Sequence, residues 1–363
     1  MVCIAAFIIL AVLVLAVPLI RLFNKRLADQ IMTLFRRSTH CFTRRITLRT
    51  CDTTFAEDVK GTVLRRVVLR YPSWVKPLSA LMELLSALII LTTIWSVLVG
   101  AKSLVSLYVY GTCNPTTPSS CSLDGSEACT IDAVPVAFNE HPVRWIGEWF
   151  SEFGEAIMAI PTKLKHWEAR DYLPSRVSYY YDDYDRRKPT ALDIIDPGCT
   201  VCANSFKKQL ARGFFKKYNV AILPYPIKDG RGGYKFPNSY LVTGYLVAVQ
   251  LKPLKKSGQP MIWRMIKRMY TGKTTDGDSN QNAFNVAYDQ AKAERVLKDW
   301  LRDFGYSDQQ LEEITKLARS DQVAKIIEDN TRLVNDKVKT KKIPTEIFAG
   351  QRHDGGFDDA TKF

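Results

Sequence analysis

The chain of 363 residues has eight cysteines, but it lacks the paired arrangement that structural zinc sites use. Cys199-Thr-Val-Cys202 is its only C-x-x-C pair, and no second C-x-x-C or C-x-x-H pair accompanies it. A structural zinc ion takes about four protein ligands, commonly as two such pairs. The sequence therefore disfavours a metal site, and none of its motifs requires a metal ion or an organic cofactor.

Charged residues are absent from two long apolar stretches. Residues 1–20 contain none, and residues 84–101 contain none either. A helix needs about 20 apolar residues to cross a bilayer, and such a length without charge is unusual for a buried core helix. We therefore predict transmembrane helices over residues 1–20 and 78–101, with Trp74 and Tyr108 near the two interfaces of the second.

The first stretch also lacks two features of a secretory signal peptide. No positively charged region precedes it, and no clear small-x-small site follows it. Both features accompany leader peptides that are cleaved. An uncleaved span with its N-terminus outside therefore fits better than a cleaved leader.

Acidic residues are scarce in the loop between the two spans, where residues 21–77 hold 13 Lys and Arg against 4 Asp and Glu. This loop carries most of the net charge of +14. Because positively charged loops stay on the cytoplasmic side, we predict a basic cytoplasmic loop with reduced Cys41 and Cys51. Membrane topology accounts for the positive charge of this loop, so nucleic-acid binding is not needed to explain it. Contact between the loop and membrane lipids is compatible with this topology. The chain is then a two-pass protein of the cell membrane, extracytoplasmic after about residue 110.

Residues 102–172 form the predicted extracytoplasmic linker, and three cysteines lie in its Pro/Ser/Thr-rich part. Disulfides form and persist in the oxidising environment outside the cytoplasm, so these cysteines can be paired there. A Cys121–Cys129 bridge is expected because a short loop closes easily, and a Cys3–Cys113 bridge would complete the set. Four cysteines allow three connectivities, so other pairings stay open.

The linker also contains an apolar stripe with helical spacing behind Pro142, formed by Trp145, Ile146, Trp149, Phe150, Phe153 and Ile157. Proline is favoured in the first turn of a helix, so we expect an amphipathic helix here. It could lie on the bilayer surface, or it could pack on the catalytic domain or a partner.

The C-x-x-C pair follows a β-rich segment and begins a helical one. Thr190–Asp196 has the composition of a buried strand, and Asp196-Pro-Gly forms a turn. The next residues place Phe206 and Leu210 on one helical face. A helix N-terminus favours thiolate over thiol, and the spacing lets the sulfurs of Cys199 and Cys202 form a disulfide reversibly. The pair is thus a predicted redox centre, with an incidental structural pair as the alternative.

A second motif lies downstream, where Ile343-Pro344 leads into a short apolar strand that ends at a glycine turn. From about Thr190 to Phe357, the order of strand, C-x-x-C helix, strand, helical segment and proline strand resembles a DsbA-like thiol–disulfide oxidoreductase of the thioredoxin superfamily. The resemblance implies an α/β thioredoxin fold over residues 173–363, with an inserted helical domain at about 238–337. It also implies a cis peptide at Pro344.

The resemblance assigns roles to these residues. Cys199 would be the attacking sulfur and Cys202 the resolving one, while Ile343 and Pro344 would bind substrate backbone beside them. The alternative for the proline is an ordinary edge-strand residue. Thr200-Val201 and Gly198 replace the Pro-His pair and the aromatic residue typical of the strongly oxidising members, and few residues follow Phe357 to form a terminal helix. These departures leave the redox potential and direction open.

The sequence thus predicts a membrane-anchored, extracytoplasmic thiol–disulfide oxidoreductase. Its partners would be protein thiols and disulfides, membrane lipids and a membrane redox partner, and nucleic acid is not expected. Two alternatives remain. One is a reductase or isomerase of the same fold, and the other is a non-catalytic membrane scaffold with a thioredoxin-like binding domain.

Overall fold

The computed structural model describes residues 14, 17–18, 20–21, 24–46, 72–114, 116, 129, 131, 137–174, 180–229, 231–254, 259–357 and 361–363. The chain divides into two compact units, Met1–Ala101 and Lys102–Phe363. Most of the predicted span over residues 1–20 lies outside the described residues, as do Cys3, Cys51, Cys121 and the side chain of Cys41.

The first unit contains a basic helix and most of a long apolar one. Helix α2 (Lys25–Ile46) has no acidic residue in its first turn, and a short 3-10 turn η1 (Pro72–Trp74) leads into α4 (Val75–Tyr110). In the described part of the chain, one helix, Lys76–Tyr110, is long and apolar enough to cross a membrane. The predicted helix over residues 78–101 is confirmed as helical and extends farther, to Tyr110.

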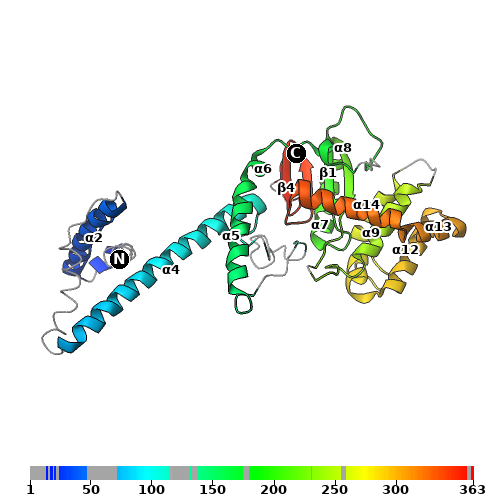
Figure 1. Ribbon diagram of the computed structural model, residues 1–363. Coiled ribbons are helices and arrows are strands. Elements are labelled where there is room, and N and C mark those ends of the chain that lie inside the picture. The colour runs from blue at the N-terminus through cyan, green and yellow to red at the C-terminus, as the bar shows by residue number, and fades with distance from the viewer. Residues whose placement is uncertain are drawn as a thin grey trace. The chain divides into compact units, whose positions relative to one another are not determined.

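A four-stranded mixed sheet with the order β2-β1-β3-β4 lies in the second unit (Figure 1). Its strands are β1 (Thr190–Ile195), β2 (Asn219–Pro224), β3 (Thr345–Phe348) and β4 (Gln351–Asp354). β1 pairs in parallel with β2 and antiparallel with β3, which pairs antiparallel with β4. All residues of β1, β2 and β3 are buried, in agreement with the mostly apolar sequences of β1 and β2, whereas β3 also carries the buried Glu346.

Two helices connect β1 to β2 and carry the aromatic part of the core. They are α7 (Thr200–Ala211) and α8 (Phe214–Lys217). Phe206, Phe214 and Phe215 are buried as the helical spacing predicts. The predicted strand, turn and helix around the C-x-x-C pair are therefore confirmed as secondary structure.

The segment between β2 and β3 is helical. It comprises α9 (Ser239–Leu251), α10 (Met261–Thr271), α11 (Asn280–Asn282), the π-helix η5 (Ala283–Ala287), α12 (Gln290–Phe304), α13 (Asp308–Ala318), α14 (Asp321–Arg332) and the π-helix η6 (Leu333–Val338). Ser307 followed by Gln310 is a sequence pattern that predicts a capping box, and α13 begins with one. The apolar residues from Phe284 to Phe304 have the spacing of a single helix, but the Asp289 side chain accepts from Lys292 N and begins a new helix.

The linker contributes α5 (Pro142–Met158), α6 (Ile160–Leu164) and the 3-10 helix η4 (Ala169–Tyr172) to the second unit. The predicted amphipathic helix is therefore confirmed as α5. Its C-terminal part packs through Ala156, with Ala159 beyond it, against Val109 and Tyr110 at the end of α4. Ile146 and Phe150 on α5 remain exposed, so only part of its apolar surface is covered within the chain.

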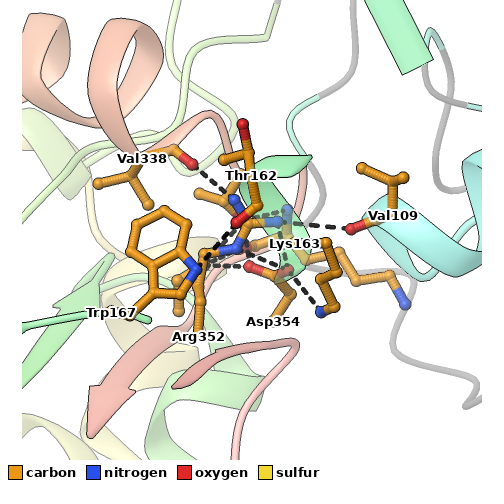
Figure 2. A network of polar contacts seen from close by, with 10 residues as sticks. Val109, Thr162, Lys163, Trp167, Val338, Arg352 and Asp354 are labelled. Atoms are coloured by element: carbon orange, nitrogen blue, oxygen red, sulfur yellow. Dashed lines mark hydrogen bonds and ion pairs between the residues drawn. The ribbon is translucent and has the colours of Figure 1, made fainter. Parts of the chain in front are cut away.

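A buried guanidinium fixes the end of α4 to the sheet (Figure 2). Arg352 on β4 donates to the carbonyl oxygens of Val338 at 2.6 Å and Val109 at 3.4 Å, and it pairs with Asp354 at 2.9 Å. Both side chains of the pair are almost fully buried, and Lys163 lies 3.7 Å from the same carboxylate. The network therefore joins α4, α6, η6 and β4 through interactions that exclude water.

We expect Arg352→Leu to lower the free energy of unfolding by about 3–5 kcal/mol, because it leaves the Asp354 carboxylate buried without its closest cation. Urea unfolding of the detergent-solubilised chain, followed by tryptophan fluorescence, measures this change. Arg302→Leu is the matched control, since Arg302 pairs with Asp299 and Asp308 on the exposed surface. The control should change stability by less than about 1 kcal/mol, and equal effects in both variants would contradict the assignment.

Candidate active site

The two cysteines of the C-x-x-C pair lie at the N-terminus of α7. Cys199 is the N-cap residue, with φ −76° and ψ 119°, and its sulfur accepts a hydrogen bond from Cys202 N at 3.3 Å. The side chain of an N-cap residue meets unpaired backbone N–H groups and the positive end of the helix dipole. The position of Cys199 thus stabilises negative charge on its sulfur when the sulfur is released as a thiolate.

Side chains from the helical segment hold the turn that precedes α7. Tyr270 donates its hydroxyl to Asp196 O at 2.9 Å, and Asn285 donates to Gly198 O at 2.8 Å. The Gln281 amide donates to both Pro197 O at 2.9 Å and Cys199 O at 2.8 Å. Asp196 O and Cys199 O also accept from Cys199 N at 3.0 Å and Ala203 N at 3.2 Å, so the side chains of α10, α11 and η5 act together with backbone bonds in positioning the cysteines.

The Asp196 carboxylate organises the same turn from the inside. It accepts from Gly198 N at 2.7 Å and from Ile227 N at 2.6 Å, and it also accepts from the Ser239 hydroxyl. Burial raises its pKa to about 6, and the hydrogen bonds from Ile227, Ser239 and Gly198 offset part of that effect.

Gly198 has no room for a side chain. A Cβ atom at this position would lie 2.5 Å from Phe236 Cβ. Phe236 thus fills the space next to the first cysteine, where the resembled family often has an aromatic residue of its own. This close approach gives a physical reason for glycine in the turn.

Cys202 is a buried thiol one turn into α7. Burial raises its pKa well above the ordinary value, and the charges of Asp196 and Glu346 act in the same direction. Hydrogen bonds from the Asp196 backbone and the Tyr270 side chain oppose that shift in the pKa of Cys202. Cys202 is therefore protonated at neutral pH, and a reaction that uses its sulfur as a nucleophile must first remove this proton.

The proline motif meets the cysteine pair across the fold. The Ile343–Pro344 bond is cis, as the resemblance implies, and Cys199 Sγ lies 3.6 Å from the carbonyl oxygen of Ile343. The two motifs are 144 residues apart in sequence, and the packing of β3 against β1 brings them together. The substrate-binding role of Ile343 and Pro344 stays a prediction.

The linker cysteine Cys129 is bonded to the site. It forms a disulfide with Cys199, with a Cα–Cα distance of 5.6 Å, and leaves Cys202 as a free thiol. This pairing replaces the Cys121–Cys129 bridge expected from the sequence. Loop length favoured the short bridge, but the hydrogen bond from Ile343 N to Cys129 O holds Cys129 next to Cys199 instead. Cys113 is also disulfide-bonded, whereas Cys3 and Cys121 lie outside the described residues.

Two buried acids lie side by side beneath the cysteines, and sequence reasoning missed both. Asp193 on β1 faces Glu346 on β3 in the antiparallel register. Ser205 and Gln209 of α7 both donate to Glu346, the latter at 3.1 Å. Burial raises the pKa of Asp193 to about 7, with a smaller opposing effect from Gln209. An aspartate within an otherwise apolar strand was the signal that could have revealed this site.

Asp193 should make the protein less stable as pH rises. A carboxyl whose pKa is higher in the folded state binds its proton more tightly there, so stability is greatest at low pH. It is lost between about pH 4 and pH 7 as the folded-state group ionises. We expect Asp193→Asn to raise the free energy of unfolding at pH 8 by a few kcal/mol and to change it little at pH 4.

Urea unfolding at both pH values measures this effect. Asp182→Asn, on the exposed surface, is the matched control. In this variant the free energy of unfolding should differ between pH 4 and pH 8 by as much as it does in the unaltered chain. An Asp193→Asn chain whose stability falls between pH 4 and pH 8 as much as that of the control would contradict the prediction. Asp196 contributes in the same direction, so a smaller residual slope is expected.

No group of three or more His, Cys, Asp or Glu side chains that could hold a metal ion occurs among the described residues. The site instead contains three sulfurs, a backbone edge before Pro344 and buried carboxyl groups. Sulfurs in this arrangement can exchange a disulfide without any added group.

Comparison with known proteins gives similarity of structure alone, since no family model and no curated protein matches the chain. Similar solved structures are DsbA-like thiol–disulfide oxidoreductases. MdbA from Corynebacterium diphtheriae is 14% identical, with a TM-score of 0.37 over 50% of this chain and 91% of that one. The thiol-disulfide exchange protein α-DsbA2 from Wolbachia pipientis is 16% identical, with a TM-score of 0.35 over 52% and 85%. ScsC from Proteus mirabilis is 19% identical, with a TM-score of 0.34 over 61% and 93%.

Proposed function

We propose that the chain is a membrane-anchored thiol–disulfide oxidoreductase that exchanges disulfides with protein substrates outside the cytoplasm. Its catalytic part would be a thioredoxin-like domain over residues 173–363, with the helical insert at about 238–337. The observation that carries this proposal is the position of Cys199, whose sulfur caps α7 beside both Cys202 and the cis peptide at Pro344. A purely structural domain would have no need of a sulfur at a helix N-terminus with a second thiol one turn away.

The reaction can be written from these residues. A substrate thiolate attacks Cys199 Sγ of a Cys199–Cys202 disulfide, so that a mixed disulfide forms and the Cys202 sulfur leaves and takes up a proton. A second substrate thiolate then attacks the substrate sulfur of the mixed disulfide and releases Cys199 as a thiolate. Two electrons pass from the substrate to the cysteine pair, and the substrate gains a disulfide. The helix N-terminus stabilises the released Cys199 thiolate, and burial favours the thiol at Cys202.

Substrate recognition would use backbone rather than side chains. The backbone before Pro344 passes Cys199, whose Sγ lies 3.6 Å from Ile343 O, and the Ile343 N–H donates a hydrogen bond to Cys129 O. Main-chain bonds of this kind recognise an extended peptide without demanding a particular sequence. Ile343 and Pro344 would thus present a substrate cysteine to Cys199, and a membrane redox partner would restore the disulfide.

The membrane part of the proposal rests on α4 and on the charge distribution. A helix of 36 residues is about 54 Å long, more than the hydrocarbon thickness of about 30 Å. Lys102, which pairs with Glu152 of α5 at 2.6 Å, would then lie beyond the bilayer on the side of the catalytic domain. Together with the uncharged residues 1–20 and the basic loop, this favours a two-pass topology with the sulfurs outside the cytoplasm.

Catalysis is tested with a fluorescent peptide dithiol and glutathione disulfide as the oxidant. We expect the full-length chain in detergent to accelerate peptide oxidation, and Cys199→Ala and Cys202→Ala to reduce the rate to that of the uncatalysed reaction. Cys113→Ser is the matched control and should retain the activity, because Cys113 lies outside the pair. Acceleration of peptide disulfide reduction instead of oxidation would identify a reductase or isomerase. Absence of exchange in both directions would leave the scaffold alternative and contradict the proposal.

Topology is tested by alkylation in intact cells. An impermeant maleimide should leave Cys51 unmodified, whereas a permeant one should modify it, since the loop of residues 21–77 would lie in the cytoplasm. Cys113 is disulfide-bonded and should react with the impermeant reagent only after an external reductant is added. Modification of Cys51 by the impermeant reagent would contradict the two-pass arrangement.

A further inference from the structure

Cys129 is attached to the active site by more than its sulfur. Its carbonyl oxygen accepts a hydrogen bond from Ile343 N at 2.9 Å, and Ile131 N donates to Lys341 O at 3.0 Å. These two bonds run in opposite senses between residues two apart on each segment, which is the pattern of an antiparallel strand pair. Cys129 and Ile131 therefore meet the residues that precede Pro344 through the two hydrogen bonds of one antiparallel bridge.

This is the edge at which a substrate polypeptide would bind in the proposed function. An extended peptide that binds at an open edge forms hydrogen bonds with unpaired backbone groups there. Because these bonds involve the main chain, the side chains of the peptide can vary. Cys129 is the cysteine of the segment that meets this edge, and its Cα lies 5.6 Å from that of Cys199, within the range of an ordinary disulfide. The geometry is thus that of an enzyme joined to a substrate cysteine, except that the substrate belongs to the same chain.

The segment that carries Cys129 closes the site. Cys129 and Cys202 are each 1% exposed, and Cys199 is fully buried. Exchange with an external protein requires a thiolate of that protein to approach Cys199 Sγ in line with the disulfide bond that breaks at this sulfur. With Cys129 in place, neither the sulfur nor the backbone edge is available to such a protein.

We propose that Cys129 is a third redox-active cysteine, and that its segment is an internal substrate that occupies the polypeptide-binding edge and bonds to Cys199. This inference rests on the proposed function and adds a partner for its catalytic sulfur. The oxidised protein then exists as two isomers. One has the Cys129–Cys199 disulfide with a Cys202 thiol, and the other has the Cys199–Cys202 disulfide with a Cys129 thiol.

The isomers interconvert without an external oxidant or reductant. The Cys202 thiol loses its proton, and the resulting thiolate attacks Cys199 Sγ, so that the Cys199–Cys202 bond forms and the Cys129–Cys199 bond breaks. The Cys129 sulfur leaves as a thiolate and takes up a proton. The number of disulfides and of thiols is the same before and after the step. Exchange with an external substrate starts from the second isomer, after the Cys129 segment has left the edge.

Tethering makes the internal substrate a strong competitor. A group tethered to the same chain has an effective concentration of the order of millimolar. An external peptide at about 0.1 mM therefore meets roughly a tenfold disadvantage at the same edge. Removal of the Cys129 thiol should remove most of this disadvantage.

The connectivity is tested on the full-length chain in detergent, equilibrated over a series of glutathione redox ratios, quenched, alkylated and mapped by mass spectrometry. We expect both the Cys129–Cys199 and the Cys199–Cys202 disulfides, in a proportion that does not change with the ratio because the two forms are isomers. Complete alkylation of Cys129 at every ratio, with no Cys129–Cys199 disulfide detected, would overturn the proposal. A Cys129–Cys199 bond that survives the most reducing ratios would also overturn it, because that bond would be structural.

The competition is tested by kinetics. Cys129→Ser should raise the rate of oxidation of 0.1 mM peptide dithiol about tenfold, whereas Cys113→Ser, a matched linker variant, should change it by less than about twofold. An unchanged rate in Cys129→Ser would overturn the proposal. If mapping finds both disulfides but no variant oxidises the peptide, the proposed function fails while the internal exchange stands, so the two failures are distinguishable.

Discussion

The turn of residues 196–199 follows the end of β1. Each of its carbonyl groups accepts a hydrogen bond from a side chain of the helical segment that follows β2. Tyr270, Gln281 and Asn285 are the donors. A buried carbonyl without a partner costs free energy comparable to a lost hydrogen bond, so these donors stabilise the turn in addition to its backbone bonds from Cys199 N and Ala203 N. The helical segment therefore does more than cover the sheet, because it fixes the direction in which Cys199 enters α7.

The same packing creates the electrostatic environment of the sulfurs. Asp193 and Asp196 are buried close to the end of β1, and burial raises the pKa of both. Burial also raises the pKa of Cys202. Burial therefore disfavours negative charge on Cys202, whereas the N-terminus of α7 stabilises it through backbone N–H groups and the helix dipole. Cys199 is the residue at that position, so the two cysteines lie in different electrostatic environments.

Local parts of this arrangement were predictable from the sequence. The strand before Asp196, the helix after Cys199 and the capping box at Ser307 each depend on neighbouring residues, and each is confirmed. The break before Asp289 was not predicted, because the apolar spacing continues across it while the cap depends on one side chain.

Contacts between distant segments were harder to predict. Pro344 could be assigned to the site through the resemblance, since a family pattern supplied the missing long-range contact. Cys129 could not, because no periodicity or motif connects it with a residue 70 positions away. The donors Gln281 and Asn285 likewise carry no local signal, as polar side chains in helices are common on solvated faces.

The attachment of α4 to the catalytic unit bears directly on the role of Cys129. Arg352 donates to the carbonyl of Val109, and Ala156 of α5 packs beside the same residue, so the end of the apolar helix is fixed to the unit that contains Cys199. Farther along the chain, Cys129 accepts from Ile343 N and is bonded to Cys199. A fragment that begins at residue 173 would contain the C-x-x-C pair and Pro344 but would lack Cys129. If Cys129 competes for Cys199 as proposed above, such a fragment exchanges disulfides with an external peptide faster than the full chain does.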